Sequence, residues 1–255
     1  MTILVACGLT REAAIIARPG FVVVAGGGDA VRLERELEAA AGGALLILSC
    51  GVAGALDPAL RAGDVVVGTL YPHAFPGEGR GPVAERADGE DSASRQGPAK
   101  LDPGLRRGSV LTDWLVQSLP NAHLGTIVGA GSIIASVAKK AALHAATGAI
   151  AVDMESHIAA RVAARHNLPF AILRTISDSA DHALPPAALV GMKPDGGVAL
   201  GAILASLARN PAQLPALIRT GRDAGAAFSA LRRALGALEA LGVGGLDLRE
   251  FALDM

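Results

Sequence analysis

Residues 151–181, AVDMESHIAARVAARHNLPFAILRTISDSAD, contain two apolar runs joined by a helical pattern. The first run leads into Asp153, Met154 and Glu155, and the second run ends close to Asp178. Strand, helix and strand in this order are typical of a parallel sheet that is covered by helices. Because burying a charge is costly, carboxylates at the ends of such runs indicate an edge of the sheet that faces a cleft.

Similar apolar runs recur along the rest of the chain and alternate with amphipathic segments. They predict strands at 3–8, 21–26, 44–49, 64–70, 124–131, 148–154 and 169–177. Helices are expected at 9–18, 29–41 and 155–166, with Thr10 and Asp29 as N-caps of the first two. Continuous β-branched runs indicate strands that are buried on both faces. We therefore predict an α/β fold: one three-layer αβα domain over residues 1–255, with a central twisted, mostly parallel mixed sheet.

Four further regions are distinguished by their composition. Residues 77–108 are rich in Gly, Pro, Ser, Arg and acids and predict a long surface loop inserted into the domain. From about Leu184 the chain is predicted to be helical, with breaks marked by prolines. The stretches GGGDA (26–30) and GVAG (51–54) are predicted to be glycine-rich turns. Close packing of a tight turn is the ordinary role of such glycines, and the alternative is that their backbone N–H groups approach an anion.

The composition restricts the class of protein. Hydrophobic residues make up 51% of the 255 residues and aromatic residues only 3%, so the core is expected to be aliphatic. A formal net charge of −1 argues against nucleic acid or an acidic membrane surface as the main partner. Cys7 and Cys50 both lie in apolar runs, which predicts reduced core thiols.

The chain shows no secretion signal or transmembrane pattern, so we expect a cytoplasmic protein. Its histidines lack metal-ligand spacing, so no metal site is expected.

Several polar features are predicted to meet at one rim of the sheet. Glu12 follows the first strand, GVAG follows the third, and Glu155 and Asp178 follow the sixth and seventh. In open α/β sheets, ligands bind beyond the carboxyl ends of the strands. Each acid also has an ordinary structural explanation, as a first-turn acid, a helix-dipole partner or a turn cap. Their coincidence on one rim favours a binding cleft.

The residue patterns resemble the purine nucleoside phosphorylase and methylthioadenosine/S-adenosylhomocysteine nucleosidase superfamily. The resemblance rests on VDME (152–155), ISD (176–178), ILVACGLTREAAII (3–16) and SCGVAGALDPALRAGDVVV (49–67). Within that superfamily, GVAGALDPALRAGD, VDMESHIAA, LPF and LPPAAL most resemble the hopanoid-associated phosphorylases. This resemblance implies removal of adenine from an adenosyl-hopane.

The resemblance also implies roles for individual residues. Asp178 takes the position of the acid that protonates purine N7, with Ser177 beside it, and Glu155 that of the carboxylate that grips the ribose hydroxyls. Further substrate contacts are implied for Met154, which packs on the sugar, for Ile133 and Ile134 beside the base, and for Gly51 and Val52 in the glycine loop. Asp153 replaces the usual glutamate of the motif and has a shorter reach.

The resemblance leaves the attacking nucleophile open. Nucleosidases use an acid at the Glu12 position to activate water, whereas phosphorylases bind phosphate, which would then be a co-substrate. Val52 stands where a serine is common in the phosphorylases, and Arg11 and Arg18 are available as cations. No cofactor is implied, the partner is a small-molecule nucleoside, and a homo-oligomer is expected. A nucleosidase for ordinary metabolites, a general purine nucleoside phosphorylase and a non-catalytic nucleoside-binding protein are the alternatives.

Overall fold

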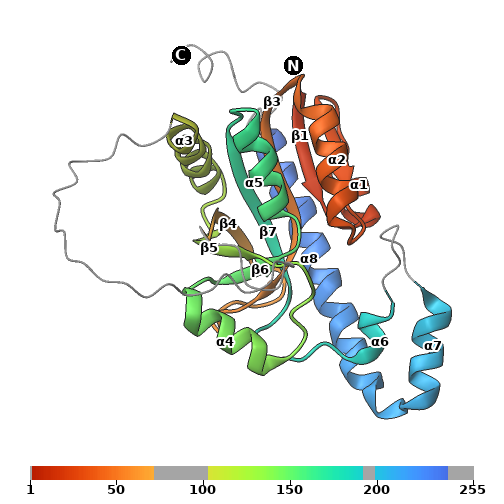
Figure 1. The fold of residues 1–255 in the computed structure, drawn as a ribbon. Coiled ribbons are helices and arrows are strands. Elements are labelled where there is room, and N and C mark those ends of the chain that lie inside the picture. Colours follow the sequence, from red (N-terminus) through yellow and green to blue (C-terminus); the bar gives the residue numbers. More distant parts are fainter. Residues whose placement is uncertain (1, 72–102, 192–198, 241–255) are drawn as a thin grey trace, which may run out of the picture.

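The computed structural model describes residues 2–71, 103–191 and 199–240 (Figure 1). In this part of the chain seven strands form one sheet. The strands are β1 (Thr2–Cys7), β2 (Phe21–Ala25), β3 (Ala44–Ala55), β4 (Val65–Leu70), β5 (His123–Gly129), β6 (Ala151–Asp153) and β7 (Phe170–Asp178). The helices are α1 (Thr10–Ile16), α2 (Ala30–Ala41), α3 (Pro103–Ser118), α4 (Val137–Thr147), α5 (Ser156–Arg165), α6 (Pro186–Leu189), α7 (Leu200–Arg209) and α8 (Leu214–Ala240), with a 3₁₀ turn at Pro211–Gln213.

The sheet is mixed and its main strands are parallel, as the apolar runs predicted. β3 pairs in parallel with β1 on one side and with β7 on the other, and β1 pairs in parallel with β2. β4 joins β7 in antiparallel orientation, and β5 and β6 continue in parallel from β4. The end of β3 then pairs with β6, Gly54 opposite Val152, which closes a ring of five strands. The carboxyl ends of β3, β6 and β7 are thereby brought together.

Helices cover both faces of the sheet, which gives the predicted three layers (Figure 1). Side chains alternate along β1: Ile3, Val5 and Cys7 pack with α1, α3 and α8 on one face. Leu4 and Ala6 pack with α2 and α5 on the other. This two-residue alternation is the normal consequence of strand geometry. The α/β fold class predicted from the sequence is therefore confirmed.

Several local predictions need correction. The GVAG stretch (51–54) is not a turn, because β3 continues through it to Ala55. Leu9, not Thr10, is the N-cap of α1, and the side chain of Glu12 reaches back to the Leu9 N–H. Asp29 does cap α2, accepting from Arg32 N–H at 2.9 Å.

The loop predicted at 77–108 is wrong for 103–108, where α3 has already begun. The remaining part, 77–102, lies outside the described residues. The helical region predicted from Leu184 contains α6, α7 and α8 within the described residues. Among those residues no helix has both the length and the apolarity that crossing a membrane requires.

Candidate active site

Glu12 is an almost completely buried carboxylate at the carboxyl end of β1. Its side chain is held by three backbone N–H groups: Gly8 at 2.8 Å and Leu9 at 2.7 Å donate to Oε2, and Val52 at 2.6 Å donates to Oε1. The first two donors come from the turn before α1 and the third comes from β3, 40 residues away. Glu12 is 1% exposed, so it is not an ordinary first-turn acid on the helix surface.

Glycines line the carboxylates because no side chain would fit. A Cβ atom at Gly51 would lie 2.5 Å from Glu12 Oε1 and 2.8 Å from a guanidinium nitrogen of Arg174. At Gly8 it would lie 2.6 Å from Glu155 Oε1. These distances are far shorter than van der Waals contact. Close approach of backbone and carboxylates is thus the reason for glycine at both positions.

Arg174, in β7, is the buried cation between these acids. Its Nε lies 2.8 Å from Asp153 Oδ2, and one terminal nitrogen lies 3.3 Å from Glu155 Oε2. The same nitrogen donates to Ser49 Oγ at 2.7 Å, and the other donates to the Val52 carbonyl at 3.4 Å. The side chain is completely buried. A buried guanidinium is tolerated only when it is paired and hydrogen-bonded in this way.

Asp153 serves the framework of the site. Besides facing Arg174, its Oδ1 accepts from the N–H groups of Glu155 at 3.3 Å and Ser156 at 3.0 Å, at the start of α5. The Ser156 hydroxyl donates to its Oδ2. The short aspartate therefore holds the beginning of the helix and orients Arg174, and Glu155 is left at the rim.

Burial and charge shift the acid–base properties of this cluster. Burial raises the pKa of Glu155 to about 8; Arg174 opposes this rise, and Asp153 and Glu12 reinforce it. Burial also raises the pKa of Glu12, against the influence of Arg174 and of three backbone N–H groups. Burial acts to lower the pKa of Arg174, but Asp153, Glu155 and Glu12 raise it above its ordinary value, so Arg174 stays charged.

We expect the raised pKa of Glu155 to make the protein less stable as pH rises. The unfolded chain releases this proton near pH 4.5 and the folded chain near pH 8, so between these values the folded state binds more protons. Stability should therefore fall across this interval and level off above it. Glu12 acts in the same direction. Melting temperatures should fall from pH 5 to pH 8 in the wild type and fall less in Glu155→Gln. An equally steep fall in the variant would contradict this assignment.

Asp178 stands at the end of β7, opposite Gly54 of β3. Lys140 Nζ of α4 lies 2.5 Å from its Oδ2, and the Ser177 hydroxyl donates to its Oδ1 at 2.9 Å. The Ser177 hydroxyl also lies 3.2 Å from the Ala53 carbonyl. A Cβ atom at Gly54 would lie 3.1 Å from Oδ2. Asp178 is thus a positioned carboxyl group with a cationic partner, which a simple turn cap would not need.

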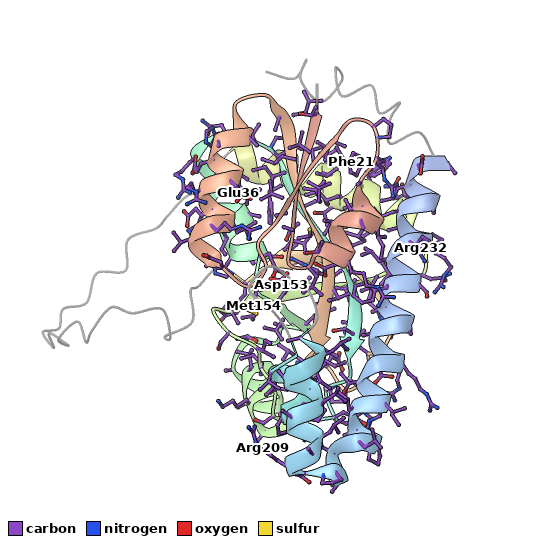
Figure 2. The ribbon with its side chains drawn as sticks, turned by 90° about the vertical axis from the view of Figure 1, so that its right-hand side faces the viewer. Phe21, Glu36, Asp153, Met154, Arg209 and Arg232 are labelled. Atoms are coloured by element: carbon purple, nitrogen blue, oxygen red, sulfur yellow. The ribbon has the colours of Figure 1, made fainter. Side chains whose placement is uncertain are left out.

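The remaining candidate residues lie around this rim. Met154 and Glu155 line a small cleft together with Gly26, Gly28 and Asp29 of the turn before α2. Figure 2 shows Met154 beside Asp153 near the middle of the molecule.

The two isoleucines follow β5 in the segment that leads to α4. Ile133 is 37% exposed there, and Ile134 packs on the apolar cluster of Leu56 and Val128. No group of three or more His, Cys, Asp or Glu suited to a metal occurs among the described residues.

Sequence reasoning missed Arg174 and Lys140. Arg174 stands inside the apolar run FAILRTISD, whereas Lys140 follows a second lysine in the stretch SVAKKAALH. A basic residue in the middle of a buried strand was an available signal for Arg174, because such a residue requires acidic partners. Lys140 gave no such signal, because a helical lysine is normally a surface residue.

The sequence of this chain is similar to those of known proteins. A family model described as the phosphorylase superfamily matches residues 5–205. A 5′-methylthioadenosine/S-adenosylhomocysteine nucleosidase from Exiguobacterium is 32% identical over 141 residues, which are 53% of this chain and 57% of that relative. The match therefore spans little more than half of either protein.

Solved structures share the fold over nearly the whole chain. An S-adenosylhomocysteine nucleosidase from Streptococcus pyogenes, in complex with 5-methylthiotubericidin, has a TM-score of 0.60 at 19% identity and covers 95% of this chain and 98% of that one. The futalosine hydrolase of Helicobacter pylori has a TM-score of 0.52 at 17% identity, with 92% and 97% covered. With the family match over residues 5–205, the sequence resemblance is confirmed at this level: the chain belongs to the phosphorylase superfamily.

Proposed function

We propose that this protein cleaves the N-glycosidic bond of a purine nucleoside, most suitably an adenine nucleoside that carries a 5′ substituent. The observation that carries the proposal is the arrangement of Glu12, Glu155 and Asp178, which follow or end β1, β6 and β7, the three strands that pair with the central strand β3. The relatives named above, a nucleosidase and a futalosine hydrolase, support it.

The three carboxylates suit the charges that develop in this reaction. As the C1′–N9 bond breaks, its electron pair moves to the purine and the ribose becomes positively charged. Asp178 passes a proton to N7, which makes the base a better leaving group. Glu155 holds the ribose hydroxyls, and Met154 packs on the sugar with its adaptable thioether. Ile133 and Ile134 flank the base.

Water is the nucleophile in this proposal. Glu12 takes a proton from the water that attacks C1′, and burial, which raises its pKa, brings it nearer to the range in which a general base works well. Arg18 does not face this site, because its guanidinium binds the Leu235 carbonyl at 3.0 Å and Glu239 at 3.4 Å on α8. Arg174 is already held by Asp153 and Glu155.

Phosphate is the second candidate nucleophile. The position of the cationic side chain of Arg11 favours it. Arg11 directly precedes Glu12, and its guanidinium lies 4.1 Å from the centre of the Phe228 ring. Within the described residues it forms no ion pair, so its charge is available to an anion. In that case free base should appear only when phosphate is supplied, and ribose 1-phosphate should appear with it.

For the 5′ group we propose a large apolar substituent of the adenosylhopane type. The support is the subfamily resemblance of residues 51–64 and 152–160, together with an aliphatic composition that is poor in aromatic residues. Methylthioadenosine or S-adenosylhomocysteine is the alternative substrate, and the nucleosidase relative favours it. A general purine nucleoside phosphorylase would instead accept inosine and adenosine well.

We expect adenine nucleosides with long apolar 5′ groups to give a higher kcat/KM than adenosine. The test is a panel of adenosine, inosine, methylthioadenosine and 5′-alkylthioadenosines of increasing chain length, each with and without phosphate. Release of free base is measured by chromatography. An equal or higher kcat/KM for methylthioadenosine or inosine would exclude an adenosylhopane-type substrate. It would favour a methylthioadenosine nucleosidase or a general purine nucleoside phosphorylase.

A non-catalytic nucleoside-binding protein is the remaining alternative. It predicts saturable binding of the same nucleosides, measured by calorimetry, with no base released under any condition. We further propose a homo-oligomer, which light scattering tests directly.

A further inference from the structure

Lys140 is a completely buried lysine whose charge the reaction outlined above does not yet use. It belongs to the first turn of α4, and its Nζ makes three contacts: Asp178 Oδ2 at 2.5 Å, the Ser179 carbonyl at 2.8 Å and the His182 carbonyl at 3.1 Å. An ammonium group has three donors and no acceptor. The three acceptors therefore match a protonated lysine and use all of its N–H groups.

The position of Lys140 is unfavourable for a merely stabilising residue. Burying a lysine is costly, and a positive charge in the first turn of a helix is opposed by the helix dipole. The helix begins at Val137 with Ser136 as its N-cap, so this cost applies to Lys140 directly. An apolar side chain would fill the same space without that cost. The charge is thus best explained by its partner, Asp178.

We propose that Lys140 is a positioning residue for the leaving purine, acting through Asp178; this inference rests on the proposed function. In the reacting complex Asp178 starts as the neutral carboxylic acid: it gives its proton to purine N7, the C1′–N9 electron pair moves onto the purine, and Asp178 becomes a carboxylate. The ammonium of Lys140 stabilises that negative charge. It also fixes the orientation of the carboxyl group, together with Ser177 at 2.9 Å from the other oxygen.

The decisive measurement is the dependence on the leaving group. A purine requires the proton from Asp178, whereas 4-nitrophenolate leaves without one. Lys140→Met should therefore lower kcat for the adenine nucleoside by about 10²-fold, on the scale of general-acid catalysis. Cleavage of the 4-nitrophenyl riboside should remain near the wild-type rate. Asp178→Asn measured on the same two substrates supplies the reference pattern, which Lys140→Met should reproduce.

Lys139 provides the matched control, because it is the adjacent lysine on the same helix and is exposed. Lys139→Met should leave the rates on both substrates unchanged.

Lys140→Gln is the second variant: its amide can still donate to the Ser179 or His182 carbonyl but carries no charge. It should retain more thermal stability than Lys140→Met and show the same selective loss of purine cleavage.

The outcomes separate this inference from the proposed function. A wild-type protein that releases no base from any nucleoside overturns the proposed function itself. An active wild type whose two Lys140 variants lose both substrates equally overturns only the inference, because that result marks a structural role. The same holds if both variants fail to fold, as judged by circular dichroism and melting curves.

Discussion

Replacing Glu12 by glutamine is expected to lower kcat by about 10²–10⁴-fold if water is the nucleophile, because the variant has no general base. If phosphate attacks, no proton needs to be removed and the loss should be much smaller. Rates of base release with and without phosphate, for wild type and variant, distinguish the two cases. Phosphate-independent turnover that is unaffected by Glu12→Gln would exclude Glu12 from water activation.

Glu12→Gln is also expected to destabilise the folded protein, and this effect must be separated from the loss of catalysis. Three backbone N–H groups point at the Glu12 carboxylate, and a glutamine would turn its NH₂ group toward at least one of them. The expected melting temperature is therefore lower than that of the wild type. Glu36→Gln is a suitable control, because Glu36 lies on α2 with its side chain 40% exposed. Rates are then compared at a temperature at which all three proteins are folded.

Replacing Asp178 by asparagine is expected to lower kcat by about 10²-fold or more, with little change in KM. The asparagine keeps the shape of the side chain and can still accept from Lys140, but it has no proton for N7. Because that proton matters mainly in the transition state, binding of the ground state should persist. Steady-state kinetics on an adenine nucleoside measure both constants.

Asp181→Asn is the matched control for this variant, since Asp181 is three residues away and its side chain is 63% exposed. If Asp178 were only a turn cap, Asp178→Asn would keep both its stability and its turnover, because asparagine caps as well as aspartate. Full kcat in a folded Asp178→Asn protein would refute its role as the acid.

Glu155→Gln should differ from Asp178→Asn by weakening substrate binding as well, because the ribose hydroxyls are already held in the ground state.

Periodicity in the sequence was sufficient to predict the layered fold. Strands and helices differ in the spacing of their apolar residues, so the apolar runs that form β1, β2, β4 and β7 could be identified one by one. GVAG was misread because glycines usually mark turns. In β3 they are there because carboxylate groups and Arg174 approach the backbone closely, and that approach comes from other parts of the chain.

The sequence by itself also determined which superfamily this chain belongs to and which acids end its strands. Their partners were decided only by the tertiary structure. Arg174 meets Asp153 because β7 and β6 both pair with β3, and Lys140 reaches Asp178 across 38 residues of sequence. Charges this far apart in the chain interact strongly only after folding has brought them together and removed the water between them. The local sequence around each residue does not show which partner it will meet.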